Sequence, residues 1–187
     1  YLKETISLNK KDIYLLTRIK GIGPKAISLI VEALSNTSHE NINPSNYEEI
    51  LPFKDIKRYQ KPLIETFSSD KYNQLKEDRE NELEFLDQSG IELISIVDSS
   101  YPELLKHIKD APPLLYLKGN SSLLNQGIGC AVVGSREHTD RGKVITEKTV
   151  DFLCQQNYTI VSGLARGIDS IAHHQTLITS SSEYKTG

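Results

Sequence analysis

Two short loops carry the side chains best suited to chemistry, and each loop follows an apolar run. Residues 134–136 (Gly-Ser-Arg) follow the run 130–133, and residues 162–167 (Ser-Gly-Leu-Ala-Arg-Gly) follow the run 158–161. Glycine lets a backbone approach an anion closely, and an arginine guanidinium presents a fork of donors that matches phosphate oxygens. A serine hydroxyl can add a further donor. Both loops therefore predict contact with a phosphate group.

The elements around the loops follow from the apolar pattern. Continuous apolar runs are typical of parallel strands that are buried on both faces, and we expect helices over about 141–156 and from residue 168. Ligands bind at the carboxyl ends of the strands in such sheets. Arg136 and Arg166 are therefore expected to meet in one phosphate-sized pocket. Taken singly, either arginine could instead be a surface side chain paired with Glu137 or Asp169.

Catalytic, metal and cofactor sites are not expected. Neither G-x-G-x-x-G after a strand nor G-x-x-x-x-G-K-[ST] occurs. His173 and His174 are the only candidates for acid–base chemistry, and neither has a visible nucleophile or ordering partner. Cys130 and Cys154 cannot build a disulfide framework, and no histidine lies at metal-ligand spacing from them.

A second candidate site lies near the N-terminus. Residues 10–35 predict two helices around a tight turn, in which two glycines expose backbone amides and Pro24 suits the first turn of the second helix. The stretch resembles the helix-hairpin-helix motif, which grips a nucleic-acid backbone without reading its sequence. Its candidate contacts are Lys20, Gly21, Gly23 and Lys25. The alternative is a hairpin that only packs two helices together.

The formal charge of −3 is unevenly distributed along the 187 residues. Residues 1–68 carry +2, residues 69–100 carry −6, and residues 101–187 carry +1. The acidic block has sparse apolar positions and predicts a largely solvated connector helix. The net charge therefore does not exclude a nucleic-acid partner. We expect a helical domain at 1–68, an acidic connector at 69–90 and an α/β domain at 91–187.

The composition, with 37% hydrophobic and 25% charged residues, is typical of a soluble globular protein. No apolar run reaches the roughly 18 residues that a membrane span needs, and no secretory signal is visible. A cytoplasmic location without membrane contact is therefore expected. The chain opens on Tyr1 and contains no Met, so we expect it to be a fragment.

Residues 91–177 resemble the DNA-processing protein A (DprA/Smf) family. The likeness rests on residues 131–136, on residues 161–169 with Ala172 and His173, and on the lead-in segments 101–105 and 112–119. The resemblance implies an α/β fold, in which a Rossmann-like parallel sheet has helices on both faces and follows a small all-α helix-hairpin-helix or SAM-like domain. The family's domain continues for about another hundred residues, a typical domain's worth of chain.

The resemblance also implies a function. Family members are non-enzymatic bacterial proteins that bind single-stranded DNA, act as dimers and load the RecA recombinase during natural transformation. The positions that carry over as backbone-phosphate contacts are Gly134, Ser135, Arg136, Ser162, Gly163, Arg166 and Gly167. Asp169 would orient Arg136 or cap its own helix.

The alternative function is that of an enzyme or binder for a nucleotide-derived phosphate ligand, related to the lysine-decarboxylase-like phosphoribohydrolases. That family carries a P-G-G-x-G-T loop with a catalytic glutamate, and no such run occurs here.

Overall fold

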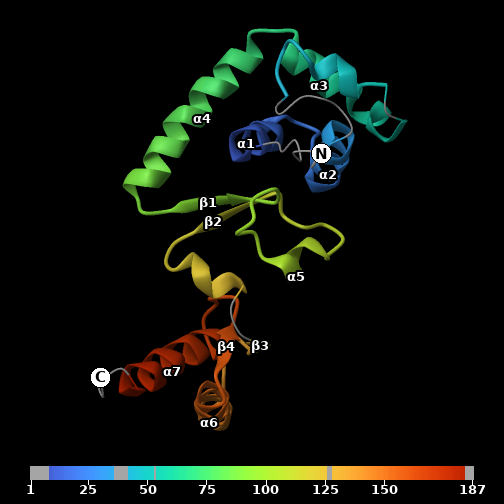
Figure 1. Cartoon of the computed structure of the whole chain (residues 1–187). Coiled ribbons are helices and arrows are strands. Elements are labelled where there is room, and N and C mark those ends of the chain that lie inside the picture. The colour runs from blue at the N-terminus through green and yellow to red at the C-terminus, as the bar shows by residue number, and fades with distance from the viewer. Residues whose placement is uncertain (1–8, 36–41, 53, 126–127, 184–187) are drawn as a thin grey trace, which may run out of the picture. The chain divides into compact units, whose positions relative to one another are not determined.

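The structure is a computed structural model that describes residues 9–35, 42–52, 54–125 and 128–183 (Figure 1). It forms two compact units, residues 1–124 and residues 125–187, each of which is described by itself. The first unit therefore takes in residues 91–124 together with the helical elements. The domain boundaries expected at residues 68 and 90 stay a prediction. Among the described residues, none of the helices combines the length and the apolar character that crossing a membrane requires.

The first unit begins with a helical hairpin. Helix α1, Lys10–Arg18, opens with a reciprocal cap in which Asn9 Oδ1 accepts from Asp12 N at 3.2 Å and Asp12 Oδ2 accepts from Asn9 N at 3.4 Å. A turn leads to α2, Pro24–Ser35, in which proline is the first helical residue. Gly21 lies in this turn at a φ of +93°, which other residues rarely adopt. The predicted pair of helices over residues 10–35 is confirmed.

Three further helical segments complete the hydrophobic core around this hairpin. They are the 3₁₀ helices η1, Tyr47–Ile50, and η2, Lys54–Tyr59, followed by α3, Gln60–Phe67. Apolar side chains from α1, α2 and these segments form one cluster, which includes Leu16, Ile30, Ile56, Leu63 and Phe67. Burial of this cluster is what holds the short helices together, because helices of this length are marginal alone.

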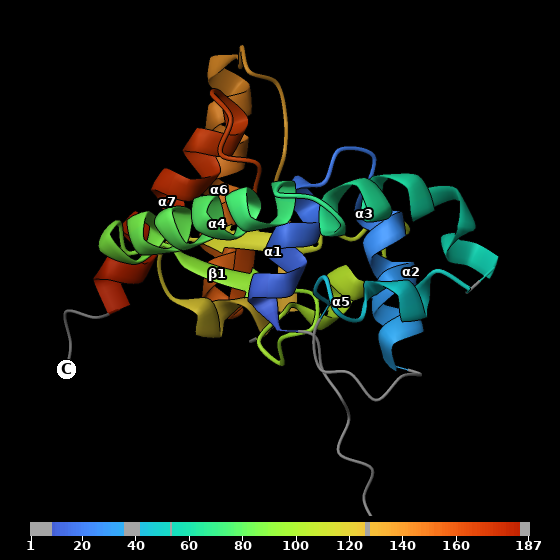
Figure 2. The same ribbon diagram turned by 90° about the horizontal axis from the view of Figure 1, so that it is seen from above.

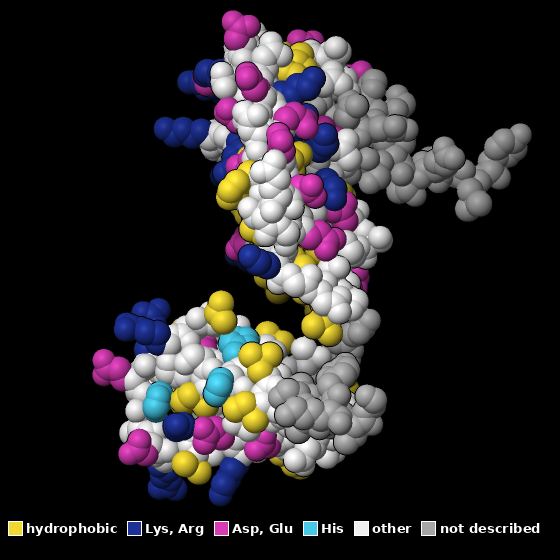
Figure 3. Space-filling view, turned by 90° about the vertical axis from the view of Figure 1, so that its left-hand side faces the viewer, with side chains coloured by type: hydrophobic (Ala, Val, Ile, Leu, Met, Phe, Trp, Pro, Cys, Tyr) yellow, Lys and Arg dark blue, Asp and Glu magenta, His cyan; other side chains and the backbone are white. Residues whose placement is uncertain are grey.

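Helix α4, Lys71–Gln88, is the acidic segment, and it packs on α1 (Figures 1 and 2). Most of its side chains are exposed, and acidic and basic groups are interleaved along it in Figure 3. The expected solvated character therefore holds for most of the helix. One side, however, is fixed to α1, where Glu80 pairs with Lys11 at 3.0 Å and Glu82 pairs with Arg18 at 2.5 Å.

A buried tyrosine strengthens this contact. Tyr14 of α1 is 1% exposed, and its hydroxyl donates to Glu82. Burial raises the pKa of Tyr14 to about 12, and the hydrogen bond to Glu82 acts in the same direction. Glu82 also accepts from the hydroxyl of Tyr116 at 3.3 Å. One carboxylate thus joins α1, α4 and the second strand of the unit.

The strands of the first unit form an antiparallel pair. Strand β1, Glu92–Ser95, pairs with β2, Leu114–Leu117, in the register Glu92↔Leu117. A turn at Asp98 follows β1: the Asp98 carboxylate accepts from Ser95 N at 2.8 Å, and Asp98 N donates to Ser95 O at 2.9 Å. The short helices α5, Glu103–Lys106, and η3, Ser121–Asn125, flank β2 in the chain.

The second unit is an α/β arrangement. Strand β3, Ile128–Ala131, pairs in parallel with β4, Tyr158–Val161, and helix α6, Asp140–Gln155, connects them. Helix α7, Ile168–Glu183, follows β4 and packs against α6. The predicted α/β class with a preceding helical part is confirmed.

In the part of the chain that the structure describes, β3 and β4 are not buried on both faces. Ile128 of β3 is 67% exposed, and Val161 of β4 is 53% exposed. The physical reason is that α6 and α7 pack mainly on each other and leave part of the two-stranded sheet uncovered.

The Tyr14–Glu82 contact gives a testable expectation. Tyr14→Phe should lower the free energy of unfolding at pH 7 by about 1 kcal/mol, the order of one hydrogen bond. Because the folded pKa of about 12 lies above the ordinary value near 10, the contribution of the phenol is complete below pH 10 and is lost as the pH rises toward 12. Urea unfolding followed by circular dichroism, at pH 7 and at about pH 11, should therefore show a smaller alkaline loss in the variant. An equal loss in both proteins would contradict this role.

Candidate functional site

The two arginine loops lie at the same edge of the parallel strand pair. The first loop, residues 132–139, follows β3, and the second loop, residues 162–167, follows β4. The register Ala131↔Val161 places the ends of both strands side by side. Val132 N extends the ladder by donating to Val161 O at 3.0 Å. The structure therefore brings together the two loops that the sequence singled out.

Asp169, in the first turn of α7, ties the loops to each other. Its Oδ1 accepts from Gly134 N of the first loop at 3.3 Å, and its Oδ2 accepts from Gly163 N of the second loop at 3.1 Å. The residue is 6% exposed. These two hydrogen bonds reach one amide in each loop, so one carboxylate fixes the spacing of the two loops.

The charge of this carboxylate is maintained by its donors. Desolvation on burial raises the pKa of Asp169, but hydrogen bonds from the backbone amides of Gly134, Ala165 and Gly163 more than offset that effect and lower the pKa. The group is therefore ionised at neutral pH. This fixed negative charge repels an anion, so attraction of an anion to the loops requires the exposed arginines.

Two glycines in the loops are required by close packing. A Cβ on Gly167, which has a φ of +85°, would lie 2.2 Å from Ser135 O, and a Cβ on Gly134 would lie 2.7 Å from Ile168 Cγ1. Between them, Ile168 N donates to Ser135 O at 3.1 Å. Sequence reasoning assigned these glycines to the approach of an anion, whereas in the structure they allow one loop to lie directly against the other.

The two serine hydroxyls are engaged inside the loops. Ser135 Oγ donates to Glu137 O at 2.7 Å and accepts from Glu137 N at 3.2 Å. Ser162 Oγ donates to Val132 O at 2.6 Å. In this structure both serines stabilise the loops, and their predicted contact with a phosphate stays a prediction.

The two arginines, unlike the serines, are not tied into the loops by an ion pair or a described side-chain hydrogen bond. Arg136 and Arg166 are both exposed, and within the described part of the chain neither forms an ion pair. The alternative in which each is held by Glu137 or Asp169 is not what the structure contains. Two exposed guanidinium groups on loops that contact each other are suited to binding a phosphate of a polyanion.

The helical hairpin of the first unit presents the second set of predicted residues together. Ile22 is 5% exposed, and its N–H donates to Ile19 O at 3.0 Å, so it anchors the turn to the core. Lys20, Gly21, Gly23 and Lys25 around it are exposed. The predicted hairpin geometry is confirmed, and the proposal that it contacts DNA stays a prediction.

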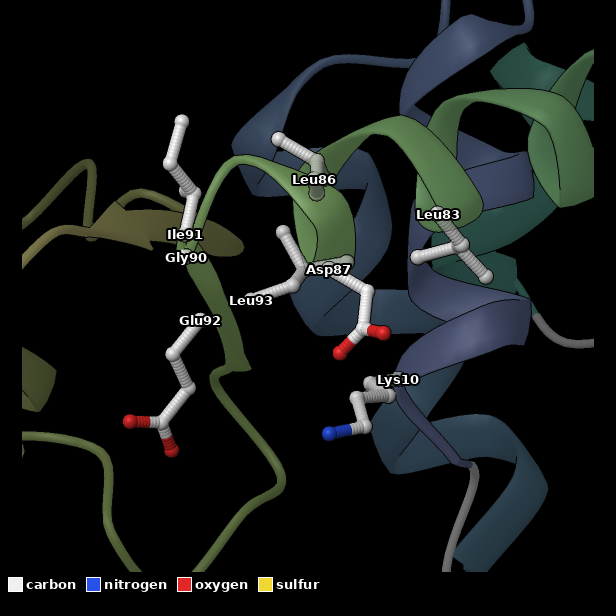
Figure 4. A pocket seen from close by; sticks show the side chains of 8 residues that line it. All are labelled: Lys10, Leu83, Leu86, Asp87, Gly90, Ile91, Glu92 and Leu93. Carbon is white, nitrogen blue, oxygen red and sulfur yellow. The ribbon is translucent and has the colours of Figure 1, made fainter.

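A separate pocket of about 360 Å³ opens between the end of α4 and β1 (Figure 4). Leu83, Leu86 and Leu93 form part of its wall, and the charged ends of Lys10 and Asp87 point toward the same opening. None of the predicted site residues lines it. The described residues contain no group of His, Cys, Asp or Glu that could hold a metal ion.

The role of Asp169 leads to an expectation about acid stability. Because its pKa is lowered on folding, its stabilising contribution is present above its unfolded pKa near 4 and is lost as the pH falls through the folded value. Asp169→Asn should lower the thermal midpoint at pH 7 and should lose less stability than the parent between pH 4 and pH 2. Circular dichroism melts over that range measure both effects. Asp140→Asn, at an exposed position of the same unit, is the matched control. If the thermal midpoints of both variants depend on pH in the same way, the proposed role of Asp169 in holding the two loops together is contradicted.

Comparison with known proteins places this arrangement in a family. A family model described as DNA recombination-mediator protein A matches residues 92–185. The chain is 40% identical over 86 residues to DNA processing protein DprA of Bacillus subtilis, with 46% of this chain and 29% of that protein covered. It is 31% identical over 177 residues to Protein Smf of Synechocystis, with 90% of this chain and 42% of that protein covered.

A solved structure is also similar. The X-ray structure of DNA processing protein A from Streptococcus pneumoniae matches 93% of this chain and 56% of that chain, with a TM-score of 0.67 and 29% sequence identity. The chain thus spans between 29% and 42% of the length of these two curated relatives. Because the family model covers half of the chain, including both arginine loops, the chain belongs to the DNA recombination-mediator protein A family, whose members here bear the names DprA and Smf.

Proposed function

We propose that this chain is part of a non-enzymatic DNA-processing protein, and that it binds the backbone of single-stranded DNA through its two arginine loops. The observation that carries the proposal is the tie between the loops: Asp169 bonds an amide from each, and an exposed arginine extends from each. The names of the relatives, DNA processing protein DprA and Protein Smf, favour this function over the nucleotide-ligand alternative.

The proposed contacts divide into two kinds. Arg136 and Arg166 are the groups that meet phosphate oxygens, because their guanidinium groups are exposed. Gly134, Ser135, Ser162, Gly163 and Gly167 act mainly by shaping the loops, through the hydrogen bonds and close approaches described above. Backbone contact of this kind reads no base and gives little sequence preference.

The partners follow from the family description. We propose that the complete protein acts as a homodimer in the cytoplasm and delivers DNA to the RecA recombinase during DNA uptake. Support comes from the description of the matching family as a recombination mediator. The second unit also exposes large apolar side chains, including Val133, Leu164 and Leu177. Figure 3 shows hydrophobic side chains exposed on one face of the molecule. Exposed apolar area of this kind fits contact with further protein surface.

The helical hairpin provides a second DNA contact in this proposal. Lys20 and Lys25 flank a turn whose glycines lie at the surface, next to the N-terminus of α2. Amides and the helix dipole at such a turn favour a phosphate. A hairpin that serves only to pack α1 on α2 is the competing explanation.

Replacing the loop arginines tests the proposal. Arg136→Ala and Arg166→Ala should each weaken binding of a fluorescent oligo-dT at least about fivefold, because each loses a hydrogen bond to a charged group worth more than about 1 kcal/mol. Each should also lower the slope of log affinity against log salt by about 0.7, the value for one phosphate of a single strand. Fluorescence anisotropy at four salt concentrations gives both numbers.

Lys148→Ala is the matched control, because it removes one exposed cation from α6 of the same unit, away from the loops. Equal losses for all three variants would indicate unspecific attraction. Unchanged binding in both arginine variants at every salt concentration would refute the site. Release of free base from a nucleoside monophosphate by the complete protein would instead support the enzymatic alternative.

A further inference from the structure

A pocket of about 320 Å³ adjoins the helical hairpin in the first unit. One wall is the hairpin itself, residues 22–24, and the opposite wall is the start of β2 with Pro113, Leu114 and Tyr116. The volume lies at the lower end of the range for pockets that hold small molecules. An aromatic side chain, Tyr116, therefore lies in the same pocket as the turn that is proposed to contact a DNA backbone.

Tyr116 is held in place but remains accessible. It is 48% exposed, and its hydroxyl donates to Glu82 Oε1 at 3.3 Å. The same carboxylate binds Arg18, whose Nη2 lies 2.7 Å from Glu82 Oε1. A ring that is fixed at its hydroxyl end and half exposed loses little rotational freedom when a planar ligand stacks on it.

The exposed lysines near the pocket favour an anionic ligand. Arg18 lines the pocket but is paired with Glu82. It also lines a neighbouring pocket of about 380 Å³, to which the exposed Lys20 and Lys71 contribute. The acidic side chain in that second pocket, Glu65, lies 3.9 Å from Lys61. Exposed lysines therefore lie next to the hairpin, and an apolar and aromatic cavity adjoins it. This combination suits a molecule that has both phosphates and flat apolar rings.

We propose that this pocket accepts one base of single-stranded DNA, stacked on Tyr116, while the adjoining backbone passes over the turn at Lys20–Lys25. The inference rests on the proposed function and extends it, because a helix-hairpin-helix turn alone contacts only the backbone. Ile22, Pro113 and Leu114 supply the apolar surround for the base. Stacking tolerates every base, because each has a π face, so the subsite adds affinity without sequence preference.

The test separates contact with the base from contact with the phosphate. Tyr116→Leu removes the ring, and Tyr116→Phe is the matched control that keeps it. Each full-chain variant is titrated with oligo-dT and with an oligonucleotide of the same length made of abasic sites. Tyr116→Leu should weaken oligo-dT binding about tenfold, within the range found for base stacking on aromatic side chains. It should leave abasic binding unchanged, and Tyr116→Phe should stay within about twofold on both.

The outcomes distinguish this subsite from the proposed function. Arg136→Ala should weaken binding of both oligonucleotides, because phosphates are present in each. If Arg136→Ala does so and Tyr116→Leu affects neither, or affects both equally, the base pocket is refuted and the arginine site stands. If the parent chain binds neither oligonucleotide, the proposed function fails and this inference fails with it.

A second readout needs no substitution. Ultraviolet crosslinking of an oligonucleotide that carries 5-iodouracil, followed by mass spectrometry of the parent chain, should label the peptide that contains Tyr116. Labelling confined to other peptides would contradict the proposed stacking.

Discussion

The hydrogen bonds of the Asp169 carboxylate are the interaction on which the candidate DNA site depends. The oxygens of this group accept from the amides of Gly134 and Gly163, and these two residues belong to loops that are separated by a strand and a helix. Because a buried carboxylate with unfilled acceptors is costly, both loops must stay close to satisfy it. Gly167 also packs against Ser135 O, and this close approach further restricts the movement of one loop relative to the other. The positions of Arg136 and Arg166 are a consequence of this tie.

A single carboxylate has a similar role in the first unit. Glu82 of α4 accepts from Tyr14 and Arg18 of α1 and from Tyr116 of β2. The acidic helix is therefore more than a solvated connector, since its charges neutralise cations of α1 and orient an aromatic side chain of β2. Tyr14 is almost fully buried, so loss of Glu82 would leave its hydroxyl without this acceptor. Tyr116 lines the pocket beside the hairpin, so its hydrogen bond to Glu82 positions part of the pocket wall.

Local chemistry determines which features the sequence could predict. The hairpin at residues 10–35 follows from helical spacing, glycines and Pro24, and the loops after β3 and β4 follow from apolar runs that end in glycine. The antiparallel pairing of β1 with β2 and the bond from Ser162 to Val132 depend on residues far apart in the chain. The sequence marks Asp169 only as an acidic residue in the first turn of a helix. The amides that its carboxylate binds become visible only in the fold.

The distribution of paired and unpaired cations makes a net charge of −3 compatible with the proposed binding of DNA. The acidic residues of α4 are partly used in pairing Lys11 and Arg18. In the described residues, Lys20, Lys25, Arg136 and Arg166 form no ion pair, and all four are exposed. Attraction over short distances depends on such local groups, because salt screens the net charge beyond about 8–10 Å. Each unit therefore keeps its own cations for an anionic strand, and binding should depend on a few identified side chains more than on the overall charge.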